Sequence, residues 1–160
     1  MLLRFGETEG GKAPYGSVDA PEICLVDFGL AAPAAPTLAP AKLVEPASWF
    51  RCIVGTSRYA SIAAHSGRAQ IPSDDVESLA YILCYLARGS KLPWQGLKLR
   101  EKKARNAAVA SVKISTSNDA LVQGCEALRP FVAAARSGAV PDYEHLESLL
   151  RSVSTARRSS

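Results

Sequence analysis

The chain has 160 residues and a mass of 17.0 kDa, which is one domain of ordinary size or part of a larger one. Apolar residues make up 48% and charged residues 21%, so the composition is globular and argues against a chain that is disordered throughout. The net charge of +4 is too small to indicate nucleic-acid binding, and no apolar stretch reaches the roughly 18 residues of a membrane span. Neither a nucleic acid nor a membrane is therefore expected as a partner.

The four cysteines of the chain stand singly, at positions 24, 52, 84 and 125, with no C-x-x-C pair. This spacing excludes a zinc ribbon and a disulfide-dense secreted fold, and it indicates free thiols in a reducing compartment. The apolar start of the chain is too short for a signal peptide, because glycines and acidic residues follow at once.

The N-terminal part of the chain predicts two short strands and a long loop. Residues 2–5 favour a strand, and the continuous apolar run 23–26 is typical of a strand that is buried on both faces. The two strands are expected to pair as a small hairpin across the Gly/Pro/Ser-rich residues 7–21. Residues 31–50 begin with an Ala/Pro-rich stretch whose prolines remove backbone donors, so they predict a loop.

The central helix is predicted over residues 76–87. Asp74 is a candidate N-cap, and Glu77, three residues later, is its candidate capping-box partner. The helix is apolar nearly all round, which is typical of a helix in the middle of a core. Gly89 is expected to end it.

Four further helices are predicted toward the C-terminus. They span the basic residues 98–110, then 118–124, then 128–137 with Pro130 in the first turn, and a last helix beginning at Asp142. The last helix is expected to bury one face, made of Tyr143, Leu146, Leu149, Leu150 and Val153. Residues 154–160 are expected to form a disordered, basic and serine-rich tail. The predicted fold class is therefore mainly α with a small β-hairpin.

The first candidate for chemistry is Asp27-Phe28-Gly29, at the end of the second predicted strand. In phosphoryl transfer a carboxylate must hold Mg²⁺ against nucleotide phosphates, and a strand end fixes the position of such a carboxylate. Taken alone, the tripeptide equally fits a plain turn after a strand.

The context of this tripeptide resembles the casein kinase I group of serine/threonine protein kinases. The resemblance rests on four segments in the same order and at similar spacing, which are GTSRYASI at 55–62, SDDVESL at 73–79, LPWQGL at 92–97 and PDY at 141–143. It covers residues 1–153, with the Ala/Pro-rich stretch as its poorest part, and Ala80 replaces the glycine usual in the group.

The resemblance implies the C-terminal lobe of a kinase-like fold. Residues 1–153 would run from just after the catalytic loop to the last helix of the large lobe, with 31–50 as the activation-segment loop. The small lobe and the catalytic loop would then be absent, so the chain alone is expected to be inactive. The activity implied for the complete enzyme is ATP-dependent phosphorylation of serine and threonine, with Mg²⁺ and ATP as cofactors, in a cytoplasmic or nuclear monomer.

The resemblance also implies residue roles around the nucleotide. Asp27 would chelate the Mg²⁺ that bridges the ATP phosphates, Phe28 would pack beneath the small lobe, and Gly29 would act as a hinge. Thr56 would lie near the catalytic base. Asp75 would accept N–H groups from the catalytic-loop backbone, although a plain N-cap role is also open.

Substrate recognition is expected to depend on Arg58, because the casein kinase I group prefers acidic or already phosphorylated proteins. An arginine in the activation segment can hold a phosphate bidentately, and Lys102 and Arg105 would complete the anion site. Two alternatives stay open from the residues themselves. The basic stretch equally fits a solvated helix face. The whole chain also fits a non-catalytic, pseudokinase-like module that binds acidic or phosphorylated partners.

Overall fold

The computed structural model describes residues 2–4, 22–24, 26, 28–31, 56–68 and 70–158. Two compact units divide the chain, Met1–Ala34 and Ala35–Ser160. The described part is mainly helical, which confirms the predicted class at that level. Asp27 and most of the predicted loop 31–50 lie outside the described residues.

The first unit contains a two-stranded hairpin, as the sequence predicts. Strand β1 (Leu2–Arg4) pairs antiparallel with β2 (Glu22–Cys24), and Leu3 stands opposite Ile23. Strand β2 ends sooner than expected, because Val26 lies beyond it and is 44% exposed rather than buried. The short 3₁₀ helix η1 (Phe28–Leu30) then closes with a hydrogen bond from the Ala31 N–H to the Phe28 carbonyl.

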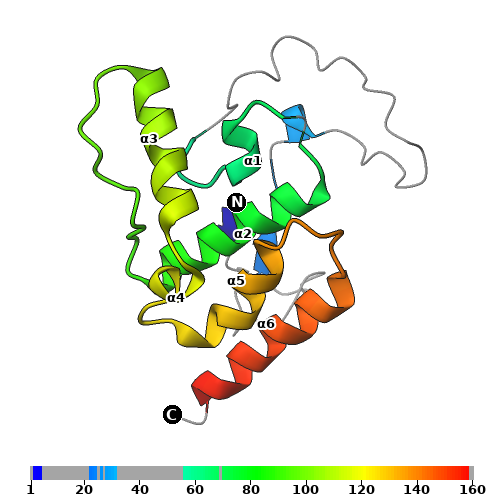
Figure 1. The fold of residues 1–160 in the computed structure, drawn as a ribbon. Coiled ribbons are helices and arrows are strands. Elements are labelled where there is room, and N and C mark those ends of the chain that lie inside the picture. The colour runs from blue at the N-terminus through cyan, green and yellow to red at the C-terminus, as the bar shows by residue number, and fades with distance from the viewer. Residues whose placement is uncertain are drawn as a thin grey trace. The chain divides into compact units, whose positions relative to one another are not determined.

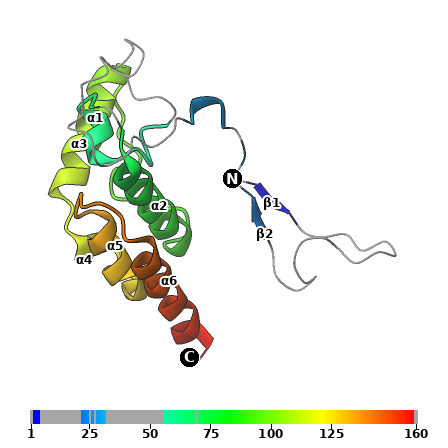
Figure 2. The ribbon, with the colours of Figure 1, turned by 90° about the vertical axis from the view of Figure 1, so that its right-hand side faces the viewer.

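The second unit is built around one central helix. Figures 1 and 2 both show α2 (Pro72–Ala87) with α1 and α3 on one side and α5 and α6 on the other. The remaining bounds are α1 (Ile62–His65), α3 (Lys102–Ser115), α4 (Asn118–Leu121), η3 (Glu126–Leu128), α5 (Arg129–Ala135) and α6 (Tyr143–Arg158). Helix α2 packs against α1 and α5, α1 packs against α3, and α5 packs against α6.

The core of this unit consists of one face of α2 and side chains from the loop after it and from α3, α4, η3, α5 and α6. Tyr81 and Cys84 are fully buried, and Trp94, from the loop between α2 and α3, is 2% exposed. The Tyr81 and Trp94 rings meet edge to face, with their centroids 4.9 Å apart. Burial raises the pKa of the Cys84 thiol to about 12, so this cysteine is an inert core residue.

Helix α2 begins two residues before the predicted N-cap. Pro72 occupies its first turn, where the fixed proline φ suits a helix and no N–H is lost. Asp74 is therefore inside the helix, and its carboxylate accepts the Ile71 N–H at 2.8 Å and the Arg68 guanidinium at 3.1 Å. The capping-box prediction for Glu77 is wrong, because its carboxylate turns instead to α1 and to Tyr81.

The prediction that α2 is buried all round is also wrong within the described residues. Val76, Ala80 and Cys84 face the core, whereas Leu79 and Leu86 are exposed, the latter by 56%. The helix ends at Ala87 as predicted, with Gly89 at φ +63° just beyond it. This left-handed conformation is one that glycine adopts without strain.

The later helices confirm the predicted order but shift its boundaries. Helix α3 starts four residues after the expected position, at Lys102, with Glu101 as its N-cap. Helix α6 continues to Arg158, so the segment predicted as a tail is helical to that point. Tyr143 is 63% exposed and is not the core residue expected, whereas Leu146 is buried. In the described part of the chain no helix has the length and apolar character needed to cross a membrane.

Two arginines of the second unit donate hydrogen bonds to backbone carbonyls at the C-terminal ends of α3 and α4. The Arg136 guanidinium donates to the carbonyls of Lys113 and Thr116 and to the side chain of Asn118. Arg88 donates to three carbonyls at the end of α4, those of residues 120, 121 and 123. Because the last carbonyls of a helix have no partner within it, these side chains supply donors that the ends of α3 and α4 lack.

Candidate functional site

The segment 57–62, which contains Arg58, is held by side chains from three other elements. Trp94 donates its indole N–H to the Arg58 carbonyl at 2.8 Å. Lys113 of α3 donates to the carbonyls on either side, those of Ser57 at 2.9 Å and Ala60. The backbone of Arg58 is thus fixed from both flanks and from its own carbonyl.

The far end of the segment is anchored by α2. The Ile62 N–H donates to Glu77 Oε1 at 3.0 Å, and the Tyr81 hydroxyl donates to the same oxygen. Ser61 caps α1 by accepting the Ala64 N–H at 3.0 Å. These bonds join residues from the segments 55–62, 73–79 and 92–97 into one network around Arg58.

Lys113 is fully buried at the centre of this network. Its ammonium lies 4.8 Å from the Tyr81 ring centroid and 5.1 Å from that of Trp94, a cation–π arrangement. Burial lowers the pKa of Lys113 to about 7, and the nearby Glu77 carboxylate acts in the opposite direction. Burial also raises the pKa of Tyr81 far above its usual value, so its hydroxyl stays a hydrogen-bond donor.

The Arg58 guanidinium lies over two tyrosine rings. Its central carbon is 5.7 Å from the Tyr59 centroid and 5.5 Å from that of Tyr85, and the two rings pack edge to face. Hydrogen bonding with Tyr59 is the largest cause of the raised pKa of Arg58, so its charge is permanent. Among the described residues no carboxylate forms an ion pair with it. The arginine is therefore oriented but its charge is not neutralised.

The basic stretch 98–105 is exposed, as the solvated-face alternative predicts. Arg105 donates to the Leu99 carbonyl at 3.2 Å, and Lys102 opens α3. Both lie on the side of α3 that carries Lys113, since steps of three and four residues stay on one helix face. Lys113 is eight residues beyond Arg105, or about 12 Å along the axis. No described contact joins Arg58 to either exposed residue.

The other predicted site residues are dispersed. Asp75 is exposed, and within the described ranges no group donates a hydrogen bond to it, while partial burial and neighbouring Asp74 raise its pKa. Thr56 is exposed. Phe28 is 67% exposed and belongs, with Gly29, to the first unit, and Asp27 lies outside the described residues. No three described His, Cys, Asp or Glu side chains cluster in a way that could hold a metal ion.

His65 of α1 lies beside the same network. Both ring nitrogens are shielded from solvent, and neither makes a hydrogen bond with a residue that the structure describes. Burial, and secondarily the charge of Lys113, lowers the pKa of His65 to about 4. The imidazole is consequently neutral at ordinary pH.

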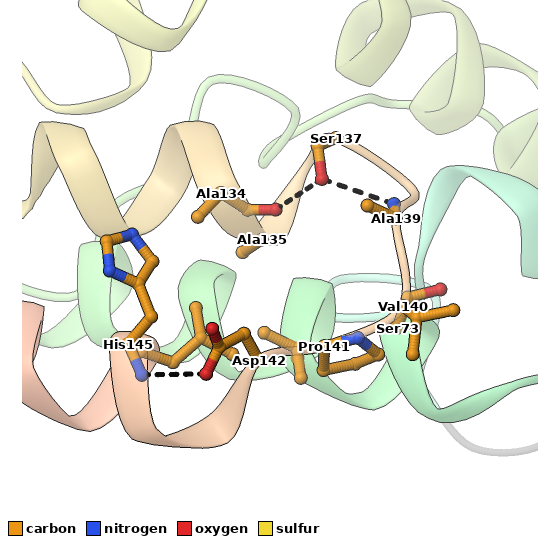
Figure 3. Close-up of a pocket in the computed structure, with 11 residues that line it drawn as sticks. Ser73, Ala134, Ala135, Ser137, Ala139, Val140, Pro141, Asp142 and His145 are labelled. Atoms are coloured by element: carbon orange, nitrogen blue, oxygen red, sulfur yellow. Dashed lines mark hydrogen bonds between the residues drawn. The ribbon is translucent and has the colours of Figure 1, made fainter.

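A separate cavity of about 190 Å³ lies between α2, α5, the loop 137–142 and the first turn of α6 (Figure 3). The Ser137 hydroxyl donates to the Ala134 carbonyl and accepts the Ala139 N–H, and Asp142 caps α6 by accepting the His145 N–H at 3.0 Å. These polar groups are occupied by the surrounding backbone, and the rest of the lining is largely apolar. The cavity shares no lining residue with the network around Arg58.

Reasoning from the sequence missed Lys113 and misassigned Glu77. One signal was available for the lysine, because it follows Val109 by four residues on the apolar side of α3. A single cation in such a stripe marks a buried polar contact. The partners of Glu77 are 15 residues before it and four after it, and the distant one is invisible to a local pattern. In the comparison with protein families, no family model matches this chain.

Proposed function

We propose that this chain is the activation segment and helical large lobe of a casein kinase I-like serine/threonine kinase acting on acidic or phosphorylated proteins. One observation carries the proposal. Three of the four segments on which the resemblance rests are far apart in the sequence, yet Trp94 bonds the carbonyl of Arg58 and Glu77 bonds the N–H of Ile62. Residues that match the family in sequence thus support one another in space.

The chemistry of the site agrees with an anionic substrate. The Arg58 guanidinium is held over aromatic rings and lacks a carboxylate partner in the described part of the chain. A phosphate oxygen pair fits its planar fork, and such charge-assisted bonds are about twice as strong as neutral ones. The exposed cations of the 98–105 stretch add attraction at longer range.

In this proposal Asp27 holds the Mg²⁺ of ATP. The chain's own described residues would position and hold the acceptor protein, and the nucleotide would be held largely by parts that the resemblance assigns to the small lobe and the catalytic loop. Phosphoryl transfer depends almost entirely on positioning and electrostatics, so the present residues alone are expected to transfer no phosphate.

A second candidate is the non-catalytic module that binds acidic or phosphorylated partners. The division of the chain into two compact units favours this second candidate. Arg58, Lys113 and the basic stretch all belong to the unit Ala35–Ser160, which has its own core. Binding through these residues needs neither Asp27 nor a nucleotide.

A chimera separates the two candidates. Residues 1–160 are joined behind the small lobe and catalytic loop of a casein kinase I enzyme, and phosphate transfer from ATP to a primed peptide is measured. The kinase proposal expects transfer by the chimera, none by the chain alone, and loss of transfer in Asp27→Ala. A folded chimera that binds the peptide without transferring phosphate contradicts the kinase and favours the module.

Arg58 is tested in the same system. Arg58→Ala is expected to weaken the use or binding of phosphorylated peptides by about 1.5–3 kcal/mol, the range for hydrogen bonds to charged groups. Unphosphorylated peptides are expected to lose less. The matched control is Arg129→Ala, an exposed arginine whose ion-pair partner is Asp119 of α4. Equal losses on both peptides would mean that Arg58 is structural.

A further inference from the structure

Arg58 sits in a segment whose backbone has unusually complete side-chain support. The carbonyls of residues 57, 58 and 60 are each taken by a side chain from outside the segment, and two of the three are taken by Lys113. Because a carbonyl direction fixes the orientation of the neighbouring peptide planes, these bonds determine where the Arg58 side chain leaves the backbone.

A lysine is a costly way to make these bonds. A fully buried ammonium loses its hydration, and an apolar residue of similar volume would avoid that loss. The groups around it offset part of the cost. These are Glu77 and the Tyr81 ring from α2 and Trp94 from the following loop. The neutral His65 of α1 adds no compensating charge, and Arg136 of α5 binds the Lys113 carbonyl and not its ammonium.

We propose that Lys113 is a positioning residue for the anion site, which it serves by holding the peptide planes on both sides of Arg58. The inference rests on the proposed function, because it assigns to Arg58 the contact with a phosphorylated or acidic substrate. Lys113 itself touches no substrate, since it is fully buried behind the segment that it supports. Its effect on binding therefore passes through the direction of the Arg58 guanidinium over Tyr59 and Tyr85.

The test compares Lys113→Met with Lys91→Met in the full chain. Both changes replace one lysine by methionine, but Lys91 is exposed in the loop after α2. Two quantities are measured on folded protein. The first is the affinity for a peptide with one phosphoserine. The second is the NMR chemical shift of the Arg58 Nε–H proton, which the ring currents of Tyr59 and Tyr85 move away from the value of a free arginine.

Lys113→Met is expected to weaken the phosphopeptide about tenfold and to abolish the ring-induced shift of Arg58. Lys91→Met is expected to change affinity less than twofold and to leave the shift intact. In an Arg58→Ala background, Lys113→Met is expected to cause no further loss, because the lysine acts only through the arginine. A merely structural lysine would lower the melting temperature without changing either measurement on the folded fraction.

Two results would overturn the inference. One is a wild-type Arg58 shift in folded Lys113→Met, and the other is additive losses in the double variant. The proposed function fails separately, if Arg58→Ala leaves phosphopeptide affinity unchanged. Should Lys113→Met not fold, Glu77→Gln and Glu77→Gln/Lys113→Met repeat the comparison. Glutamine keeps the acceptor for Ile62 and Tyr81 and leaves no uncompensated carboxylate behind.

Discussion

The two ends of α3 carry the same charge in opposite environments. At its start, Lys102, Lys103 and Arg105 are exposed, and at its end Lys113 is completely buried between two aromatic rings. The exposed group keeps its hydration and acts through long-range attraction, which salt screens. The buried lysine acts through directed hydrogen bonds and depends on Glu77. A dense run of cations is therefore the weaker sign of a specific role, and an isolated cation in an apolar stripe is the stronger one.

The largest effect on stability is expected from removing the Glu77 carboxylate, which lies near the buried Lys113 of α3. Glu77→Ala leaves the Ile62 N–H and the Tyr81 hydroxyl without their acceptor and leaves Lys113 without a compensating charge. Each buried donor left without its acceptor costs about 1–3 kcal/mol, so the loss of both is expected to cost about 2–6 kcal/mol. The free energy of unfolding, measured by urea denaturation, is expected to fall by that amount.

The matched control for this change is Glu101→Ala at the exposed end. Glu101 precedes α3, and its side chain makes no capping bond. Its removal is expected to change stability by less than about 0.5 kcal/mol. Similar small losses for both glutamates would contradict the distinction between the two ends of α3.

An intermediate effect is expected from pH. Lys113 has a pKa of about 7 in the folded protein and 10.5 when unperturbed, so between these values the unfolded chain binds the additional proton. Stability contributed by Lys113 is therefore gained as pH rises from 7 and is lost as pH falls through 7, at no more than about 1.4 kcal/mol per pH unit. The stability of Lys113→Met is subtracted from that of the wild type at each pH. The difference contains the contribution of Lys113 and excludes the titration of the cysteines and tyrosines that both proteins share.

Thermal unfolding of the wild type, Lys113→Met and Lys103→Met between pH 7 and 8.5 checks this expectation. The wild type is expected to gain stability relative to Lys113→Met across this range, whereas Lys103→Met is expected to run parallel to the wild type. A difference curve that is flat, or that falls with pH, would show that Lys113 remains protonated in the folded protein.

The smallest effect is expected at the exposed end. Lys102→Ala is expected to weaken phosphopeptide binding by about 0.2–1 kcal/mol at low salt, as exposed charge pairs do, with no change in stability. At 0.5 M salt the effect is expected to disappear because the charge is screened. A loss as large as that of Arg58→Ala, or one that persists at high salt, would place Lys102 in direct contact with the phosphate.

The order and type of the two strands and of helices α2 to α6 were predictable because they depend on local patterns, whereas the short elements η1, α1 and η3 were not predicted. Apolar spacing located the later helices, Gly89 marked the end of α2, and Pro130 marked the start of α5. The hairpin pairing followed from two short apolar runs, although β2 proved shorter than its run. These features are determined by backbone stereochemistry and side-chain period, which neighbouring residues alone set.

The boundaries and exposed faces were less predictable because distant residues decide them. Helix α3 ends where Arg136, more than twenty residues later, binds its carbonyl. Leu79 and Leu86 look like core residues in sequence but are exposed, whereas Val76, Ala80 and Cys84 of the same helix are buried. Asp74 was correctly placed near a helix start, but Pro72 moved that start and turned the carboxylate toward Arg68.

By itself the sequence determined that the described chain is mainly helical, that Arg58 precedes a tyrosine in a short loop, and that a basic stretch opens α3. Only the tertiary structure decided what surrounds Arg58. The Trp94 indole, the Lys113 ammonium and the Glu77 carboxylate reach the segment 57–62 from 15 to 56 residues away. Desolvation and hydrogen bonding depend on atoms that meet in space. The same residue type is therefore a hydrated surface charge at one end of α3, as Lys102, and a buried positioning group at the other, as Lys113.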